Sequence, residues 1–280
     1  MEWFNETLYP NIGQRFQVTK VVFREKTEHQ DLVIFETPVL GRVLALDGVI
    51  QVTEGDEFVY HEMLTHVPLT AHGRAKRALI IGGGDGGIAR EMLKHPLERV
   101  VMVEIDRAVV DLCTKYLPGV SAGAFEDKRL DLVIADGCKY VAETEERFDV
   151  IVVDSTDPQG PGEVLFTESF YRDCSRALAP GGVLCVQDGV PFLQPDELVM
   201  VNGRLKKFFA DAYAYVAAIP TYYGGFMALG WATDDKTLRQ TKAEVLRERF
   251  GKLCIKTRYY TPDLHAGAFH PPRFIADKLA

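Results

Sequence analysis

Between residues 77 and 209 the chain alternates short apolar runs with segments of helical character, and this alternation constrains its fold most strongly. The apolar runs, which are too short to be helices, lie at 78–81, 100–103, 132–135, 149–153 and 183–186. Helices are predicted at 88–95, 108–116, 169–177 and 195–209. The alternation predicts a mainly parallel sheet with helices on both faces. Runs at 215–219 and 226–233 should add an antiparallel pair.

The first part of the chain has a different texture. Residues 16–25, 31–36 and 41–46 are rich in β-branched and aromatic side chains, and Asp47-Gly48 is a hairpin turn signal before a further run at 49–53. A helix should begin after Glu57. We therefore expect an N-terminal β-strand domain over residues 1–62 and an α/β catalytic domain of Rossmann-like type over residues 63–280.

Composition excludes several classes of protein. The net charge of −8 disfavours nucleic acids and anionic membranes as partners. The five cysteines include no Cys-x-x-Cys pair, which predicts reduced thiols and neither a disulfide framework nor a metal site. No run of 18 apolar residues is present, and the first residues lack the basic segment of a signal peptide. We expect a cytoplasmic protein that does not span a membrane.

Carboxylates follow four consecutive strands of the predicted sheet. They are Asp85 in the loop after the first strand, Glu104 after the second, Asp136 after the third, and Asp154 with Asp157 after the fourth. In an open α/β sheet, ligands bind beyond the carboxyl ends of the strands, so these side chains should meet at one edge. An aspartate after a strand often caps the next helix instead, and for each single residue that alternative stays open.

The loop at 82–87 fits the pattern G-x-G-x-x-G, and Glu104 lies about 20 residues further on, where a ribose ligand is expected. This pattern alone supports any nucleotide-binding unit. Asp85 inside the loop disfavours a pyrophosphate, because two like charges in a desolvated loop repel each other. The loop therefore suits a cationic nucleoside without phosphates, such as one of the S-adenosylmethionine type.

Taken together, these residues resemble the spermidine synthase family, over nearly the whole chain. The segments that carry the resemblance lie at 60–63, 82–87, 103–106, 136–137, 154–158, 160–161 and 219–222. The resemblance implies a methyltransferase-type Rossmann-like sheet and transfer of an aminopropyl group from decarboxylated S-adenosylmethionine to putrescine. It also implies a homodimer or homotetramer. The decarboxylated donor would be a co-substrate, and no cofactor is expected.

The family's functional residues carry over to matching positions. Those implied for the nucleoside donor are Gln30, Gln51, Asp85, Glu104, Asp136, Gly137 and Pro161. Those implied for the diamine are Tyr60, His61, Asp85, Asp154, Ser155, Asp157, Gln187 and Tyr222. Asp154 would be the catalytic base, and the segment that begins there would close over the bound substrates.

The reaction requires a deprotonated amine. An alkylamine has a pKa near 10.4 and an ordinary aspartate near 3.9, so moving the proton would cost about 9 kcal/mol unless burial narrows the gap. Many family members carry glutamine where this chain has His61. With an ordinary pKa of about 6.5, His61 would repel the diamine only when protonated, and KM for diamine would rise below that pH.

Three other functions remain open from the sequence. An S-adenosylmethionine-dependent N-methyltransferase would use the same fold and Glu104, although Asp85 would repel the carboxylate of its donor. A non-catalytic nucleoside- or polyamine-binding protein is disfavoured by the presence of both Tyr60 and Asp154. An NAD-dependent dehydrogenase is disfavoured by Asp85. Cadaverine, agmatine and spermidine also remain open as acceptors.

Overall fold

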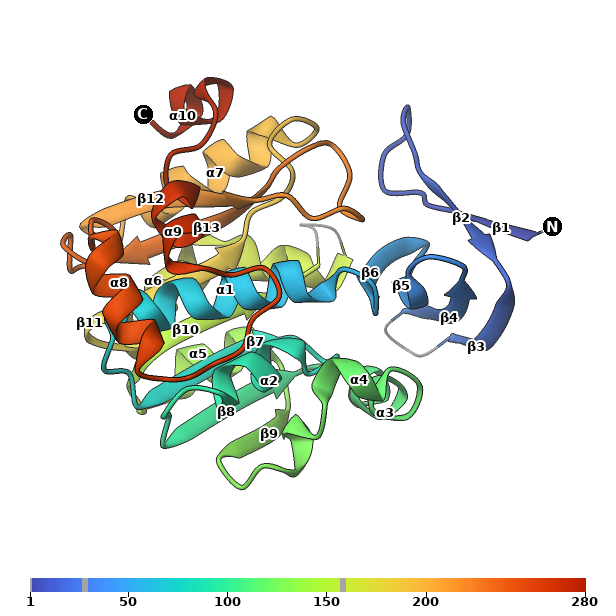
Figure 1. Cartoon of the computed structure of the whole chain (residues 1–280), viewed down its shortest axis with the longest axis horizontal. Helices are drawn as coiled ribbons and strands as arrows, with labels where there is room; N and C mark the ends of the chain where they lie inside the picture. Colours follow the sequence, from blue (N-terminus) through green and yellow to red (C-terminus); the bar gives the residue numbers. More distant parts are fainter. Residues whose placement is uncertain (1, 27–29, 157–159) are drawn as a thin grey trace.

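A large α/β unit and a smaller β unit lie side by side in the computed structural model, which describes residues 2–26, 30–156 and 160–280 (Figure 1). Within this part of the chain, seven strands form the large sheet in the order β12-β13-β11-β10-β7-β8-β9. Their bounds are β7 (Arg77–Gly82), β8 (Arg99–Glu104), β9 (Leu130–Ile134), β10 (Phe148–Asp154), β11 (Leu178–Gln187), β12 (Asp211–Ala217) and β13 (Met227–Thr233).

The strand pairing agrees with the sequence pattern. β9, β8, β7, β10 and β11 pair with one another in parallel, while β13 runs antiparallel to both β11 and β12. The strand expected at 215–219 begins earlier, at Asp211, and ends earlier, at Ala217. The chain passes from β7 to β8 on one side and later returns to β10 on the other. This reversal opens a crevice at the carboxyl ends of β7 and β10, where Asp154 pairs with Gly82.

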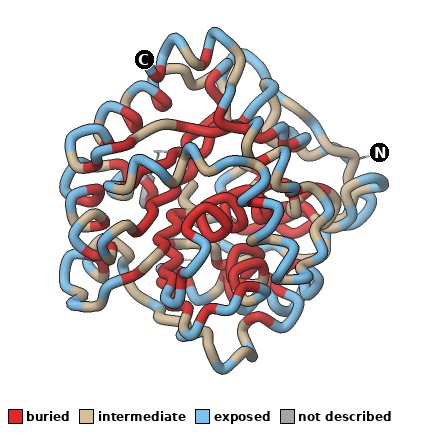
Figure 2. Tube along the Cα trace, turned by 60° about the vertical axis from the view of Figure 1, so that its left-hand side comes forward, coloured by how far each residue is buried: buried red, intermediate tan, exposed pale blue. Residues whose placement is uncertain are grey.

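Helices cover both faces of the sheet, as the alternation predicted. Ala78 and Ile80 of β7 point to one face and pack with α1 (Glu57–His72) and α2 (Gly87–Leu93). Leu79 and Ile81 point to the other face, among apolar residues of α5 (Gly137–Glu143), α6 (Glu168–Ala177) and α7 (Pro195–Leu205). Figure 2 shows the resulting concentration of buried chain in the interior.

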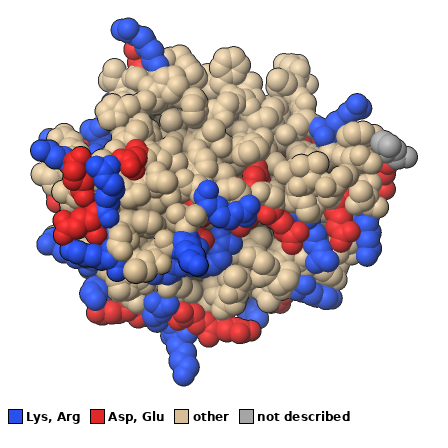
Figure 3. Space-filling model, viewed as in Figure 1, with Lys and Arg blue, Asp and Glu red and all other residues tan. Residues whose placement is uncertain are grey.

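The remaining helical segments surround this core. They are α3 (Arg107–Tyr116), α4 (Pro118–Ser121), η1 (Ala124–Glu126), η2 (Gly160–Phe166), α8 (Ala243–Gly251), α9 (Pro262–Ala268) and α10 (Arg273–Leu279). No helix among the described residues is both long and apolar enough to cross a bilayer. On the face seen in Figure 3, acidic and basic side chains are interspersed around a broad uncharged area, so this face offers no continuous basic surface.

The N-terminal unit holds two sheets. β1 (Glu2–Asn5) pairs with β2 (Arg15–Val18), and the second sheet has the order β3-β4-β5-β6. Its strands are β3 (Lys20–Lys26), β4 (Asp31–Thr37), β5 (Gly41–Leu46) and β6 (Val49–Thr53). The run at 16–25 is divided between β2 and β3, because the chain changes sheets near Thr19. The Asp47-Gly48 turn is confirmed, with φ values of 49° and 82°.

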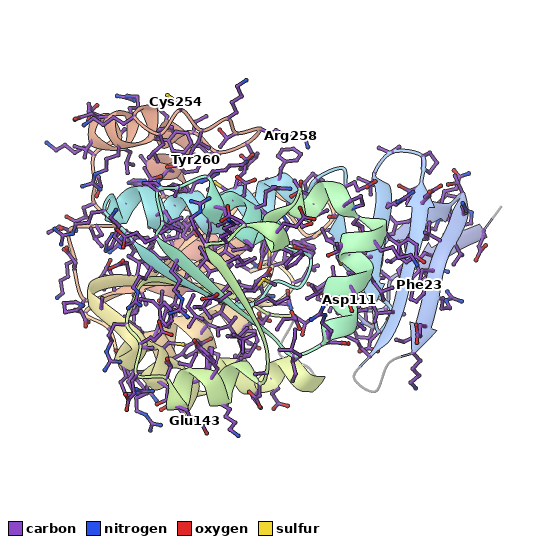
Figure 4. All side chains as sticks on the ribbon, turned by 90° about the horizontal axis from the view of Figure 1, so that it is seen from below. Phe23, Asp111, Glu143, Cys254, Arg258 and Tyr260 are labelled. Atoms are coloured by element: carbon purple, nitrogen blue, oxygen red, sulfur yellow. The ribbon has the colours of Figure 1, made fainter. Side chains whose placement is uncertain are left out.

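The N-terminal sheet packs against α3. Leu32 and Leu44 share a buried cluster with Val109 and Cys113 of that helix, and the ring of Phe23 stacks on Tyr116 with centroids 5.4 Å apart. In Figure 4, Phe23 lies on the sheet next to the helix that carries Asp111. The domain division predicted at residue 62 falls within the continuous helix α1 and stays a prediction.

Candidate active site

A cavity of about 500 Å³ lies at the crevice between β7 and β10 and is closed from the other side by the N-terminal unit. Both units contribute residues: Gln30 and Gln51 come from the N-terminal unit, and the glycine loop and Asp154 come from the sheet edge. Residues predicted for the nucleoside and residues predicted for the diamine therefore line one cavity. The described lining residues with acidic side chains are Glu6, Asp47, Asp85, Glu104 and Asp154.

The glycine loop brings the backbone close to these acids. Gly82 has φ 84°, and a Cβ there would lie 2.1 Å from the carbonyl oxygen of Asp154. A Cβ on Gly84 would lie 2.9 Å from Oε2 of Glu104. Only glycine permits both approaches. Asp85 is fixed because its Oδ1 accepts a hydrogen bond from the Gly87 amide at 2.7 Å. The loop thereby holds three carboxylates at the ends of three strands.

Asp154 is the best-placed base. The Tyr60 hydroxyl donates a 2.7 Å hydrogen bond to its Oδ1. Burial, followed by the nearby charge of Asp85, raises the pKa of Asp154 to about 6, while His61 and the Tyr60 hydrogen bond oppose the rise. Burial also raises the pKa of Tyr60 well above its ordinary value, so Tyr60 remains a donor. This environment makes Asp154 more basic than an ordinary aspartate.

His61 differs from the sequence expectation. Its Nδ1 lies 2.6 Å from Oε2 of Glu57, and its Nε2 lies 3.4 Å from Oδ2 of Asp85. Although burial alone would lower the pKa of His61, Asp85 and Glu57 raise it to about 10. The expected ordinary pKa near 6.5 is therefore wrong, because the sequence does not reveal that two carboxylates enclose the ring. Glu57 was not among the predicted site residues, although its i, i+4 spacing to His61 on a helix was a usable signal.

Glu104 is a buried residue of the cavity lining. Its Oε1 accepts a hydrogen bond from the Asp106 amide at 2.9 Å. Burial raises the pKa of Glu104 to about 7, against the effect of backbone hydrogen bonds from Asp106 and Ile105. Gln30 donates a 3.1 Å hydrogen bond to Oδ2 of Asp106 and so also lies beside this group. The arrangement leaves a carboxyl group facing the space in which a ribose was predicted.

Aromatic and amide side chains also line the cavity. The rings of Tyr60 and Tyr222 meet edge to face with centroids 5.8 Å apart, and the Tyr222 hydroxyl donates to the carbonyl oxygen of Gln51. Gln187 is buried and lines the cavity together with Ser155. A residue that the sequence reading missed, Tyr9, lies at the same cavity and donates to Oε1 of Gln194 at 2.9 Å.

Four predicted positions are not among the described lining residues. Asp136 is exposed, and its Oδ1 caps α5 by accepting from the amides of Cys138 and Lys139 at 2.7 and 3.2 Å. Gly137 begins that helix. Asp157 lies outside the described residues, and the side chain of Pro161 is not described either. Among the described residues, no cluster of three or more His, Cys, Asp or Glu side chains could hold a metal ion.

Comparison with known families identifies the architecture. A model described as the spermine/spermidine synthase domain matches residues 57–242, and one described as the spermidine synthase tetramerisation domain matches residues 2–54. The chain belongs to the spermidine synthase family. The two family matches meet at the start of α1, where the N-terminal strands give way to the large sheet. The resemblance inferred from the motifs is confirmed.

Relatives and solved structures of this family match almost the whole chain. A polyamine aminopropyltransferase of Serratia proteamaculans (strain 568) is 56% identical over 99% of this chain and 96% of the relative. One of Pseudomonas syringae pv. tomato is 56% identical over 98% and 96%. A spermidine synthase in complex with the transition-state analogue AdoDATO superimposes with a TM-score of 0.94 at 37% identity, covering 99% and 94%. The Thermotoga maritima spermidine synthase gives 0.91 at 36% identity, with the same coverage.

Proposed function

We propose that this enzyme is a spermidine synthase, which transfers an aminopropyl group from decarboxylated S-adenosylmethionine to putrescine and releases spermidine and methylthioadenosine. The observation that carries the proposal is the position of Asp154, a partly buried carboxylate held by Tyr60 at the floor of an acidic cavity. The relatives named above are polyamine aminopropyltransferases, and a neighbour of the same fold binds a transition-state analogue.

The chemistry is an in-line displacement. A nitrogen of the diamine attacks the methylene carbon next to the sulfonium, the new C–N bond forms as the C–S bond breaks, and methylthioadenosine leaves as a neutral thioether. Because the sulfonium is already a good leaving group, the displacement itself needs no metal or redox cofactor. The amine gives up its proton to Asp154.

The environment of Asp154 reduces the cost of that proton transfer. With a pKa of about 6 for Asp154 and about 10.4 for a free amine, the gap corresponds to about 6 kcal/mol, compared with about 9 kcal/mol for an ordinary aspartate. The rings of Tyr60 and Tyr222 surround the same space, and burial of the amine against them would lower the pKa of the amine further. Asp154 thus acts as general base, with Tyr60 orienting its carboxylate.

The donor would occupy the glycine-loop side of the cavity. Glu104 accepts hydrogen bonds from the ribose hydroxyls, and Asp85 binds the aminopropyl ammonium. Gln30, Gln51, Asp136, Gly137 and Pro161 keep their predicted roles around the nucleoside, and Ser155, Asp157, Gln187 and Tyr222 theirs around the diamine. Asp85 also argues for the decarboxylated donor, because the carboxylate of ordinary S-adenosylmethionine would meet a like charge there.

Two further properties belong to this proposal. The N-terminal unit matches a tetramerisation domain, which supports a homotetramer over a homodimer. The five cysteines are free thiols in the structure, which supports a reducing compartment such as the cytoplasm.

The test is product formation. The protein is incubated with putrescine, cadaverine, agmatine or spermidine, each with the decarboxylated donor or with S-adenosylmethionine, and products are identified by mass spectrometry. We expect spermidine from putrescine with the decarboxylated donor. A methylated amine would instead identify an N-methyltransferase. The Asp154→Asn variant should lose at least a hundredfold in kcat while binding methylthioadenosine with unchanged affinity. Equal losses in both would mean that Asp154 only binds ligand.

A further inference from the structure

A row of alternating charges runs from the surface of α2 into the cavity. Arg90 contacts Glu57 through two hydrogen bonds, Nη1 to Oε1 at 3.1 Å and Nη2 to Oε2 at 2.8 Å. Oε2 of Glu57 lies 2.6 Å from Nδ1 of His61, and Nε2 of His61 lies 3.4 Å from Oδ2 of Asp85. The side chains of His61 and Glu57 are 3% and 8% exposed, so the row is shielded from water.

The last glycine of the loop makes room for this row. A Cβ on Gly87 would lie 2.2 Å from Nδ1 and Cε1 of His61, so the imidazole occupies the volume that any other residue at 87 would fill. In the G-x-G-x-x-G pattern, this glycine usually serves close packing of helix and strand. Here it allows the ring of His61 to lie against the start of α2, with a nitrogen facing a carboxylate on each side.

The two carboxylate contacts of His61 favour a proton on each ring nitrogen. Neutral imidazole has a single N–H, so one of its nitrogens would present a lone pair to a carboxylate oxygen. The imidazolium presents an N–H to each: it donates to Glu57 at 2.6 Å and lies at ion-pair distance, 3.4 Å, from Asp85. The charged or titratable groups around His61 are Glu57 and Tyr60 on its own helix, Asp85 from the loop before α2 and, further away, Asp154 from β10, with Arg90 behind Glu57. The nearest of these, Glu57 and Asp85, are acidic.

His61 also has a special place in the cavity. Among the described residues that line it, His61 is the only side chain able to carry a positive charge. Without substrates, it balances part of the negative charge of Asp85 and Asp154. A diamine that enters the same space brings positive charges to the same carboxylates.

We propose that Glu57 is a positioning residue that keeps a proton on His61 in the unliganded enzyme, and that His61 releases this proton to solvent when the cationic diamine binds. The proposal rests on the proposed function, because it takes the diamine as the ligand of this cavity. Acceptor binding is then an exchange of one cation for another: the diamine ammonium takes over the carboxylates, and neutral His61 can accept a hydrogen bond.

The magnitude is sufficient for this exchange. A unit charge about 4 Å from the imidazolium, at an effective dielectric constant of about 20, weakens proton binding by about a thousandfold. The pKa of His61, about 10 in the unliganded protein, would then fall to about 7. The cationic donor would lower it further. Near pH 8, His61 therefore changes from charged to mostly neutral on binding.

Calorimetry measures this proton directly. Putrescine is titrated into the full-length protein saturated with methylthioadenosine, which prevents turnover, at pH 8 in buffers that differ in ionisation enthalpy. The slope of the observed enthalpy against the ionisation enthalpy of the buffer gives the number of protons released. We expect the wild-type protein to release nearly one proton more than His61→Gln. The number of protons released by Glu57→Gln should lie between these two values, because the pKa of His61 should be lower when Asp85 is its only close carboxylate. His270→Gln, at an exposed histidine far along the chain, should match wild type.

Equal proton counts for wild type and His61→Gln would overturn the proposal, and a Glu57→Gln count equal to wild type would overturn the role of Glu57. If a variant fails to fold, the pH dependence of the wild-type Kd for putrescine between pH 7.5 and 9 still tests the proposal. One released proton requires Kd to fall about tenfold per pH unit, and a flat profile would overturn the linkage. If instead the proposed function is wrong, the wild-type protein makes no spermidine in the mass-spectrometric assay, whatever the proton count.

Discussion

Replacing Glu104 with glutamine should stabilise the unliganded enzyme, and the gain should grow with pH. Glu104 is 8% exposed, and burial raises its pKa from an ordinary 4.5 to about 7. Between these values the folded state binds more protons than the unfolded state, so the free energy of unfolding falls as pH rises. The raised pKa of Glu104 therefore lowers the free energy of unfolding by about 1 kcal/mol at pH 5 and by about 3 kcal/mol at pH 8.

Glutamine at position 104 removes this cost without removing the local contact. Its Oε1 can still accept the hydrogen bond from the Asp106 amide, and it carries no charge that Asp154 or Asp106 would repel. For a protein of this size, about 3 kcal/mol corresponds to a rise in Tm of about 6 °C at pH 8, with about 2 °C at pH 5. Thermal unfolding at one protomer concentration, without ligand, measures both values.

Two comparisons make the result decisive. Glu98→Gln changes a side chain that is 69% exposed, so the Tm of this variant should equal that of the wild-type protein at every pH. Methylthioadenosine should raise the Tm of the wild-type protein much more than that of Glu104→Gln, because the amide is a poorer acceptor for ribose hydroxyls than the carboxylate. A Tm difference between Glu104→Gln and wild type that stays constant from pH 5 to pH 8 would refute the reasoning, because the ionisation of Glu104 would then carry no cost.

Two further substitutions test other parts of the structure. Tyr60→Phe removes the hydroxyl that donates to Asp154. A hydrogen bond to a charged group is worth about 1.5–3 kcal/mol, so the pKa on the acid side of the kcat/KM profile should rise by about one to two pH units. An unchanged pKa would contradict the role of Tyr60. Asp188 is buried, neither carboxylate oxygen has a hydrogen-bond partner among the described residues, and burial holds its pKa well above the usual range. Asp188→Asn should therefore raise Tm in thermal unfolding, more at pH 8 than at pH 5, and a lower Tm at both pH values would contradict this account.

The sequence alone determined the framework of the site. Strand-and-helix alternation predicted a mainly parallel sheet, and parallel strands bring their carboxyl ends to one edge whatever the details of packing. Asp85, Glu104 and Asp154 could therefore be placed together although they are far apart along the chain. Local chemistry also located the Asp47-Gly48 turn, since both residues tolerate positive φ.

Only the tertiary structure decided the charges within that framework. The pKa of His61 depends on Asp85, which lies on another element, and that of Glu104 depends on how completely the surrounding chain excludes water. In the same way, Asp136 precedes a helix that it caps, whereas Asp154 turns into the cavity, although both simply follow a strand in the sequence. The sequence shows which side chains can be titrated. The pKa of each such side chain depends on its burial and on neighbouring charges, which are set only when distant segments of the chain pack together.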